Sequence, residues 1–391
     1  MTLADYGAPP TVEARGRVGG RVWTVEAPGG DLAELGGEWI FEDDTVLQSL
    51  AARFGLGLAQ IGVDFRSREA RGGLGATVDE QRQFLRSASV LLASMSSQEV
   101  ASTTLGEFLS RVPGTARQKA TVRARLQGTI AVDLDRVALR VADQNLFRTE
   151  SGRQWRMTKG NQALAVEMAG RVHVRLNCRV TAVRTAGRET TIVVGSGDRE
   201  EAIMADAVVV AVPLPVLREI SFDPALPGDL IGAIASTPMG DASKLVVPTA
   251  GAPPLVGVQS VEGPFWCWTG LDADARVRRC LTAFAGSSEA QVSLQTSGGD
   301  PGRWVSRVRS LVPEMPITGP ALLHHWGSDP MAGGSYSAVS NEPWGTIAAF
   351  ERPLGSLVLA GEHTAGVRWH GTMEGALRSG IRAARQVIDL A

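Results

Sequence analysis

The residues with the clearest chemical meaning stand near the start of the chain. Residues 10–14 read P-T-V-E-A, a short strand pattern that ends close to Glu13, and residues 15–21 read R-G-R-V-G-G-R. An acid at the end of a short strand is the group with which a dinucleotide-binding βαβ unit holds a ribose. In such a unit the acid follows an earlier strand and a glycine loop. Its appearance at position 13 therefore raises the question of where those earlier parts lie.

The end of the chain carries a second pattern that favours ligand binding. The strand pattern S-L-V-L-A-G at 356–361 is followed by an acid, a small-residue turn and a helix pattern rich in glycine and alanine. The first N–H groups of a helix have no intrahelical partner, and they attract anions or carbonyl oxygens. Two interpretations stay open here. The helix N-terminus binds a ligand, or the helix packs closely on a sheet without one.

Lysine is rare in this sequence. Among 39 basic residues only Lys119, Lys159 and Lys244 are lysines, and Lys244 stands at the head of the strand pattern K-L-V-V. It has either a role in a site or the ordinary role of a solvated lysine that discourages pairing at an edge strand. His363 and His370 do not form a metal-ligand pattern with other residues of the sequence, so we predict no metal site around them.

Composition excludes several classes of protein. Of the 391 residues, 44% are hydrophobic and 20% are charged, and the formal net charge is −2, so nothing indicates nucleic-acid binding. We find no signal-peptide pattern and no run of about 18 apolar residues that would span a membrane. Three scattered cysteines suit neither a disulfide framework nor a metal site, and we expect a cytoplasmic protein.

The strands and helices that must position these residues are expected at the following places in the sequence. Short strands are expected at 21–26, 172–176, 190–194, 205–213 and 356–361. The run at 205–213 is almost wholly apolar, which is typical of a strand buried on both faces. Helical periodicity dominates from residue 44 to about residue 145, notably in 79–95 and 98–112, and predicts a helical insertion.

Five stretches, in order along the chain, carry a family resemblance. They are V-E-A-R-G-R-V-G-G-R at 12–21 with E-L-G-G-E-W at 34–39, G-N-Q-A-L-A near 160, A-D-A-V-V-V-A-V-P-L-P-V-L at 205–217, H-W-G-S-D-P-M-A-G-G-S-Y at 325–336, and L-A-G-E-H-T-A to S-G-I-R-A-A at 359–384. With them the chain resembles the flavin-containing amine oxidases, which include monoamine, polyamine and L-amino-acid oxidases. The resemblance implies an α/β fold with a Rossmann-like FAD-binding domain, truncated at its N-terminus, and an α+β substrate domain. Both are discontinuous, with residues 1–60, 150–215 and 350–391 for FAD and 61–149 and 216–349 for the substrate.

The resemblance also implies which residues hold FAD. Glu13 would bind the adenosine ribose, and Glu362 would take the ribityl or phosphate side. The backbone of Val180 would contact the adenine edge, and the backbone N–H of Met373 would face the flavin pyrimidine. The segments beside the pyrophosphate and flavin contribute Arg15, Gly19, Gly20, Arg21, Gly36, Gly37 and Gly361. Ser335 stands where covalently flavinylated members carry cysteine, so the FAD is expected to be non-covalent.

In the same family a lysine holds a water near the reactive flavin nitrogen, and Lys244 matches it. The amine site of the family is walled by aromatic rings, and Tyr336 and Trp369 stand at two such places. Thr372 replaces the second ring of the cage found in monoamine oxidases. Trp326 is close in sequence, although a buried tryptophan is more often a core residue than the wall of a site.

One expected part is missing from the sequence. The acid of a dinucleotide-binding unit lies about 20 residues after the glycine motif, and counting back from Glu13 runs past Met1. The first ten residues are therefore expected to be the last turn of a crossover helix and its loop. Three explanations stay open. The start codon is placed too late, another chain supplies the segment, or this lineage has lost the usual FAD anchor.

The resemblance implies an oxidoreductase that oxidises an amine to an imine and passes electrons to dioxygen, forming hydrogen peroxide. The alternative is a flavin-free derivative of the fold, which acts as a binding protein or a non-redox catalyst. Retention of Glu13, Lys244 and the segment 361–380 favours the oxidase, whereas the absent glycine loop and Thr372 favour the derivative. The substrate, whether a small-molecule amine or an amino acid, and the oligomeric state stay open.

Overall fold

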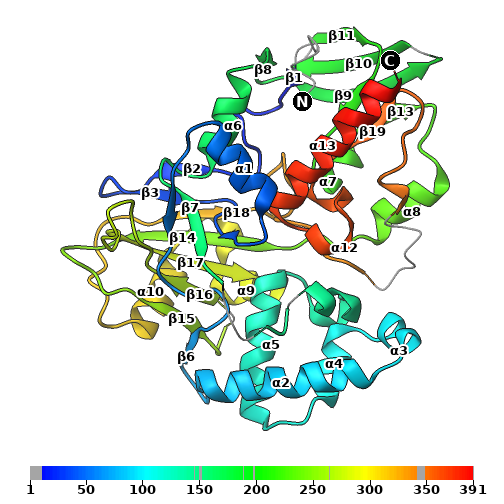
Figure 1. The fold of residues 1–391 in the computed structure, drawn as a ribbon. Helices are drawn as coiled ribbons and strands as arrows, with labels where there is room; N and C mark the ends of the chain where they lie inside the picture. Colours follow the sequence, from blue (N-terminus) through cyan, green and yellow to red (C-terminus); the bar gives the residue numbers. More distant parts are fainter. Residues whose placement is uncertain are drawn as a thin grey trace.

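The structure is a computed structural model that describes residues 11–390, apart from 145, 149–151, 188, 197–198, 264 and 341–347. The expected helix turn and loop within residues 1–10 thus lie outside the described residues. Figure 1 shows the N- and C-terminal parts of the chain at one end of the molecule and a group of helices at the other, with a large sheet between them. Among the described residues, no helix combines the length and apolar character that a membrane crossing requires.

Parallel strands from distant parts of the chain pair at the end that holds both termini. Strand β1 (Thr11–Val12) pairs with β8 (Val174–Arg175), and β12 (Val208–Val210) pairs with β19 (Leu357–Leu359). These are two separate two-stranded sheets. The strand expected at 205–213 is shorter than predicted, and only Val210 of β12 is fully buried, so the expectation of burial on both faces was wrong for Val208 and Val209.

The main sheet has six strands in the order β18-β14-β17-β16-β15-β6. Successive side chains of a strand point to opposite faces. On β14, Leu245 and Val247 join a core with helices α9 (Ser288–Leu294) and α10 (Gly302–Leu311). Lys244 therefore points to the other face of the sheet, the face that carries the candidate site. The six strands span Leu322–His325, Ala242–Pro248, Cys280–Gly286, Phe265–Trp268, Gly257–Ser260 and Glu69–Arg71, in the order given above.

The predicted helical insertion is confirmed, with different boundaries. The helices are α2 (Val78–Ser94), α3 (Ser97–Ser102), α4 (Leu105–Arg111) and α5 (Ala116–Ile130), at the lower end of Figure 1. The single helix expected at 98–112 is two helices, because Thr103 is extended and Thr104 starts a new capping box with Glu107. Each of the four helices has such a capping box, and their apolar faces share one core.

The other described elements are smaller sheets and further helices. A four-stranded sheet has the order β11-β10-β9-β13, a three-stranded sheet has the order β4-β7-β5, and β2 pairs with β3. Their bounds are Arg199–Ala205, Glu189–Ser196, Arg179–Ala186 and Ser221–Asp223, then Ile40–Phe41, Gln154–Met157 and Leu58–Gln60, then Thr24–Glu26 and Leu32–Glu34. The helices are α1 (Thr45–Arg53), α6 (Gln162–Ala169), α7 (Leu214–Leu217), α8 (Gly228–Ser236), α12 (Gly366–Trp369) and α13 (Met373–Leu390).

Candidate functional site

Glu13 stands at the carboxyl end of a parallel strand, as its predicted role requires. The pairing of β1 with β8 continues through Glu13, whose N–H donates to the carbonyl of Arg175 over 2.9 Å. One carboxylate oxygen of Glu13 accepts the N–H of Arg15 at 2.8 Å, and the other has no hydrogen-bond partner among the described residues. The side chain is partly exposed, so its second oxygen is available to a hydroxyl group.

The two arginines predicted to lie beside a pyrophosphate are paired with carboxylates of the chain itself. Arg15 contacts Asp329 at 2.7 Å, and Arg21 contacts Glu362 at 2.8 Å. Arg17 differs from both. Its terminal nitrogens are buried without a hydrogen-bond partner among the described residues, and its guanidinium lies 4.5 Å from the ring centre of Trp23. Burial, reinforced by the charge of Arg15, lowers the pKa of Arg17 to about 10.

Glu362 joins three segments that are far apart in the sequence. It accepts the N–H of Ser337 at 3.2 Å and the N–H of Gly371 at 2.9 Å, in addition to its contact with Arg21. Burial opposes the charge of this carboxylate, but Arg21, the nearby histidines and the hydrogen bonds outweigh burial and lower its pKa to about 2. Glu362 was predicted to contact the ribityl or phosphate side of FAD. In the structure, its carboxylate is bonded to residues of the chain itself.

Close packing or a positive φ angle favours glycine at the predicted positions. Residues 15–21 are called the first segment. Gly36 passes so near this segment that a Cβ atom on Gly36 would lie 2.1 Å from the carbonyl oxygen of Arg21. A Cβ atom on Gly37 would lie 2.9 Å from the sulfur of Met373, at the start of α13. Gly19 and Gly20 both have positive φ angles, 102° and 56°. These residues bring the first segment and the last helix together at one place.

Two further predicted cofactor residues stand at strand ends. Val180 lies near the start of β9 and pairs with Val194 of β10, whereas β13 pairs with β9 only from Ala182 onwards. The edge of Val180 opposite β10 is therefore not covered by β13. Gly361 follows β19 with a φ angle of 126°, which turns the chain into the segment of Glu362.

Lys244 is buried, and its ammonium group is ion-paired. Its Nζ lies 2.7 Å from a carboxylate oxygen of Glu38 and donates to the carbonyl of Gly36 over 2.9 Å. The other oxygen of Glu38 accepts the indole N–H of Trp268 at 3.2 Å and lies 3.4 Å from Arg156. Burial opposes the negative charge of Glu38, but Lys244 and Arg156 outweigh it and lower its pKa. Because β14 has partners on both sides, the interpretation of Lys244 as a solvated edge-strand lysine is wrong.

A second buried carboxylate lies close to this pair. Glu34 accepts the N–H of Asn161 at 2.8 Å and the hydroxyl of Thr24 at 2.9 Å. Burial, with the nearby charge of Glu38, raises the pKa of Glu34 to about 7. The sequence alone did not mark Glu34, Glu38 or Arg156 as site residues. Two acids in a stretch that also holds a pair of glycines, E-L-G-G-E-W, were the only signal for the first two.

The predicted aromatic residues converge on one region, with different degrees of burial. The carbonyl of Tyr336 accepts the N–H of Gly240, and its hydroxyl donates to the carbonyl of Thr129 over 2.5 Å. Burial raises the pKa of this phenol. Trp369 is partly exposed and lies 4.5 Å from the guanidinium of Arg378. Tyr336 and Trp369 lie within two residues of the two N–H groups that donate to Glu362.

Thr372 and Trp326 have structural contacts. Thr372 is exposed, and its hydroxyl accepts the N–H of Gly375 at 2.9 Å, which makes Thr372 the N-cap of α13. Trp326 is only 3% exposed and donates to the carbonyl of Leu35 over 2.9 Å, as a core residue does. His324 lies 3.4 Å from Asp329, and His363 is buried against Phe350. Among the described residues, no group of three or more His, Cys, Asp or Glu side chains could hold a metal ion.

Aromatic side chains surround the site face of the main sheet. Trp266 and Trp268 stack with ring centres 4.0 Å apart, and Trp39 lies 5.3 Å from Trp266. Phe65 closes the group 5.6 Å from Trp266. We call Trp39, Phe65, Trp266 and Trp268 the aromatic box. Lys244 borders it, with its Nζ 5.5 Å from the ring centre of Trp268.

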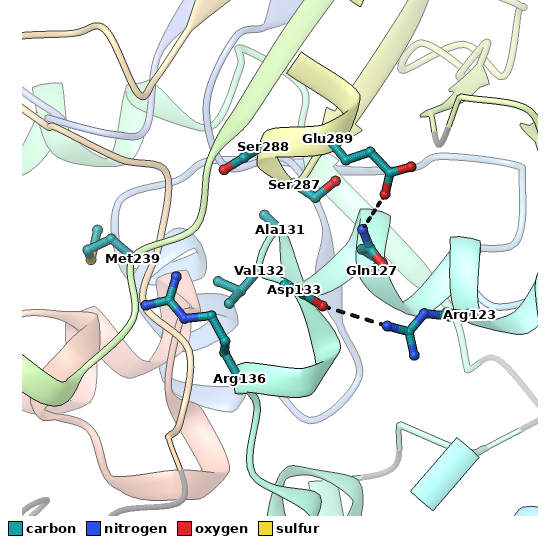
Figure 2. A pocket seen from close by; sticks show the side chains of 10 residues that line it. All are labelled: Arg123, Gln127, Ala131, Val132, Asp133, Arg136, Met239, Ser287, Ser288 and Glu289. Carbon is teal, nitrogen blue, oxygen red and sulfur yellow. Dashed lines mark hydrogen bonds and ion pairs between the residues drawn. The ribbon is translucent and has the colours of Figure 1, made fainter. Parts of the chain in front are cut away.

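A separate cavity of about 250 Å³ lies between α5 and the start of α9. Figure 2 shows its charged rim, where Arg123 pairs with Asp133 and Gln127 donates to Glu289. None of the predicted site residues lines this cavity. Its lining residues are Arg123, Gln127, Ala131, Val132, Asp133, Arg136, Met239, Ser287, Ser288 and Glu289.

Comparisons with known proteins agree with this architecture. The family model of flavin containing amine oxidoreductases matches residues 2–388. Polyamine oxidase 4 of Oryza sativa is 29% identical over 66% of this chain and 54% of its own length. The flavin-containing amine oxidase of Danio rerio is 25% identical over 99% of this chain and 82% of its own length. The chain spans about half the length of the polyamine oxidases that it matches.

Solved structures share the fold. Putrescine oxidase bound to putrescine has a TM-score of 0.80 at 20% identity, over 99% of this chain and 95% of the other. Cyclohexylamine oxidase from Brevibacterium oxydans has a TM-score of 0.79 at 20% identity, over the same shares of the two chains. These likenesses confirm the predicted α/β fold class.

Proposed function

Because the chain belongs to the flavin-containing amine oxidoreductase family, we propose that it is an FAD-dependent oxidase of amines. The product is an imine, and dioxygen is reduced to hydrogen peroxide. Bound FAD would supply the acceptor for the hydride equivalent from the carbon that bears the amine, and the route by which the electrons reach dioxygen. The observation that carries the proposal is the buried Lys244, which Glu38 holds beside the aromatic box.

The described residues fit FAD at three places. Glu13 has an unpartnered carboxylate oxygen at the carboxyl end of β1, suited to a ribose hydroxyl group. Arg17 has two buried nitrogens without an acceptor, suited to a phosphate oxygen. The buried hydroxyl of Ser335 is also without a partner, and the carbonyl of the same residue accepts from Arg21. A serine forms no thioether, which supports non-covalent binding.

The residues of the chain have three tasks in the reaction. Lys244 keeps its ammonium group in place through Glu38 and the carbonyl of Gly36, and we assign to it the water that hydrolyses the imine. The aromatic box excludes other water and provides apolar contact for the substrate. Tyr336 lines the substrate side, with its phenol kept neutral by burial and held by Thr129.

A flavin-free derivative of the fold is the second candidate, and one observation favours it. Arg15 and Arg21, the basic residues predicted for the pyrophosphate, are both paired with acids of the chain.

The test is an absorption spectrum of the purified protein before and after addition of excess FAD, followed by desalting. We expect a flavin band that stays with the protein and is bleached anaerobically by an oxidisable amine. Peroxide should form when air is admitted. A protein that retains no FAD, with or without residues encoded upstream of Met1, would contradict the oxidase and favour the flavin-free derivative.

A further inference from the structure

Arg68 is a buried cation without a buried anion. The residue is 1% exposed, and its guanidinium lies 3.8 Å from the ring centre of Trp266 and 4.8 Å from that of Phe65. Its Nε donates to the carbonyl of Phe65, and its Nη2 donates to the hydroxyl of Thr129. No carboxylate of the described residues lies within 4.0 Å of it. The third nitrogen, Nη1, makes no hydrogen bond with a described residue.

The charges near Arg68 have both signs, because Arg125 opposes its charge and Asp64, which forms no ion pair with it, favours it. Arg125 is also buried, and it donates to the carbonyl of Arg66 over 2.6 Å. Burial, with the charge of Arg125, lowers the pKa of Arg68 well below its ordinary value. The aromatic contacts offset part of the cost of burying a guanidinium, but an uncompensated buried charge is unfavourable in a folded protein. A bound anion would remove that cost.

Arg68 borders the proposed substrate site on two sides. Trp266, on which it stacks, belongs to the aromatic box and stacks in turn on Trp268, which neighbours Lys244. On the other side, Arg68 and Tyr336 both bond to Thr129, one to its hydroxyl and the other to its carbonyl. A substrate between Tyr336 and the aromatic box would therefore have the guanidinium of Arg68 at its edge.

We propose that Arg68 binds a carboxylate of the substrate, so that the preferred substrate is an α-amino acid. This inference rests on the proposed amine oxidase function. A guanidinium fork fits a carboxylate with two parallel hydrogen bonds. A diamine or polyamine would instead place a second ammonium group near Arg68 and Arg125. Of the two buried acids near Lys244, Glu38 is already paired with Lys244 and Arg156, and Glu34 accepts hydrogen bonds from Asn161 and Thr24.

The test compares substrates that differ only by the carboxylate. L-ornithine and putrescine form one such pair, and L-phenylalanine and phenethylamine form another. For the FAD-loaded protein, we expect kcat/KM for the amino acid to exceed that for its decarboxylated partner in both pairs. Faster oxidation of both decarboxylated amines would overturn the inference and leave the proposed function intact. If none of the four is oxidised and FAD is not retained, the proposed function itself fails.

Variants then assign the effect to Arg68. Arg68→Gln should lower kcat/KM for the amino acids about 100-fold, mainly through KM, as loss of a charge-assisted pair predicts, and change that for the amines much less. Arg68→Lys, which keeps the charge without the fork, should have an intermediate effect. The matched control is Arg171→Gln, since Arg171 also stacks on a ring, Phe54 at 4.6 Å, but is exposed.

A binding measurement keeps the inference testable if Arg68→Gln folds poorly. Benzoate should bind to the FAD-loaded wild-type protein in calorimetry, and benzylamine should bind at least tenfold more weakly. Arg68→Lys should weaken benzoate binding, and Arg171→Gln should not. Equal binding of benzoate by the wild-type protein and Arg68→Lys would assign Arg68 a structural role and overturn the inference.

Discussion

The buried pair of Lys244 and Glu38 makes the site sensitive to loss of either charge. Lys244→Met leaves Glu38 buried with Arg156 as its remaining charged partner, at 3.4 Å. Removing one partner of a buried ion pair costs about 3–5 kcal/mol, so we expect the free energy of unfolding in urea to fall by about that amount. The double variant Lys244→Met with Glu38→Gln should lose less than the sum of the two single changes.

The control for this prediction is Lys119→Met. Lys119 is partly exposed and bonds only to the carbonyl of Ser110 among the described residues, so its loss should change stability by less than about 0.5 kcal/mol. An unfolding free energy of Lys244→Met within 1 kcal/mol of wild type would show that the pair contributes little, contrary to its geometry.

Glu362 links stability to pH in a defined window. Its pKa in the fold is about 2, against an ordinary value of 4.5, so the charged carboxylate favours the folded state. The contribution is complete above about pH 4.5 and is lost as pH falls towards 2. The shift corresponds to about 3 kcal/mol. Unfolding free energies at pH 7, 5, 4 and 3 should therefore decline more steeply for wild type than for Glu362→Gln, and parallel curves would contradict the assignment.

At the residue scale, the sequence indicates which residue types matter but not their partners. Lys244 stands out because lysine is rare, yet its partner Glu38 lies 206 positions away. Arg21 and Glu362 are 341 positions apart, and both were assigned to a cofactor. Only the complete fold brings such residues into contact, so sequence reasoning could not foresee that these charges neutralise one another. The same reason hid Arg68, whose neighbours come from three separate segments.

At the element scale, the start of α13 depends on Thr372. Its hydroxyl accepts the N–H of Gly375, and the same hydroxyl donates to the carbonyl of Trp369 over 2.7 Å. We expect Thr372→Ala to lower the free energy of unfolding by about 1 kcal/mol, because an N-terminal N–H loses its acceptor. Thr372→Ser should retain most of that stability. A Thr372→Ala variant as stable as wild type would show that water replaces the cap without cost.

Elements with strong local signals were predicted well. The helix pattern from residue 44 and the final helix pattern correspond to α1 and α13. Asp44, at the start of α1, makes no side-chain cap bond with the helix. Glu374, at the start of α13, instead accepts the N–H groups of Val46 and Leu47. The strand expected at 21–26 begins only at Thr24, because the start of β2 depends on a pairing partner that periodicity does not reveal.

At the scale of the whole molecule, three distant parts of the chain meet around one location. The first segment, the segment of Ser335 and Ser337, and the segment from Gly361 to Met373 are joined by Arg21 and Glu362. The division into two discontinuous domains stays a prediction. What this convergence adds is a physical reason for ligand-linked stability, since a cofactor that bridges these segments binds only when all three are folded.

FAD should therefore raise the thermal unfolding midpoint of the whole protein. At a concentration of 100 times the Kd, a ligand that binds only the folded state adds about 2.7 kcal/mol to the free energy of unfolding, enough for a rise of several degrees.

Arg17→Gln should reduce that rise in the thermal unfolding midpoint, because the two unpartnered nitrogens of Arg17 are the basic groups still open to a phosphate in the first segment. Loss of one charge-assisted contact weakens FAD binding about 10- to 100-fold. Arg82→Gln, on the exposed surface of α2, is the control and should respond to FAD as wild type does. An equal rise for wild type and Arg17→Gln would place the phosphates away from Arg17, and no rise for either would mean that these three segments meet without FAD between them.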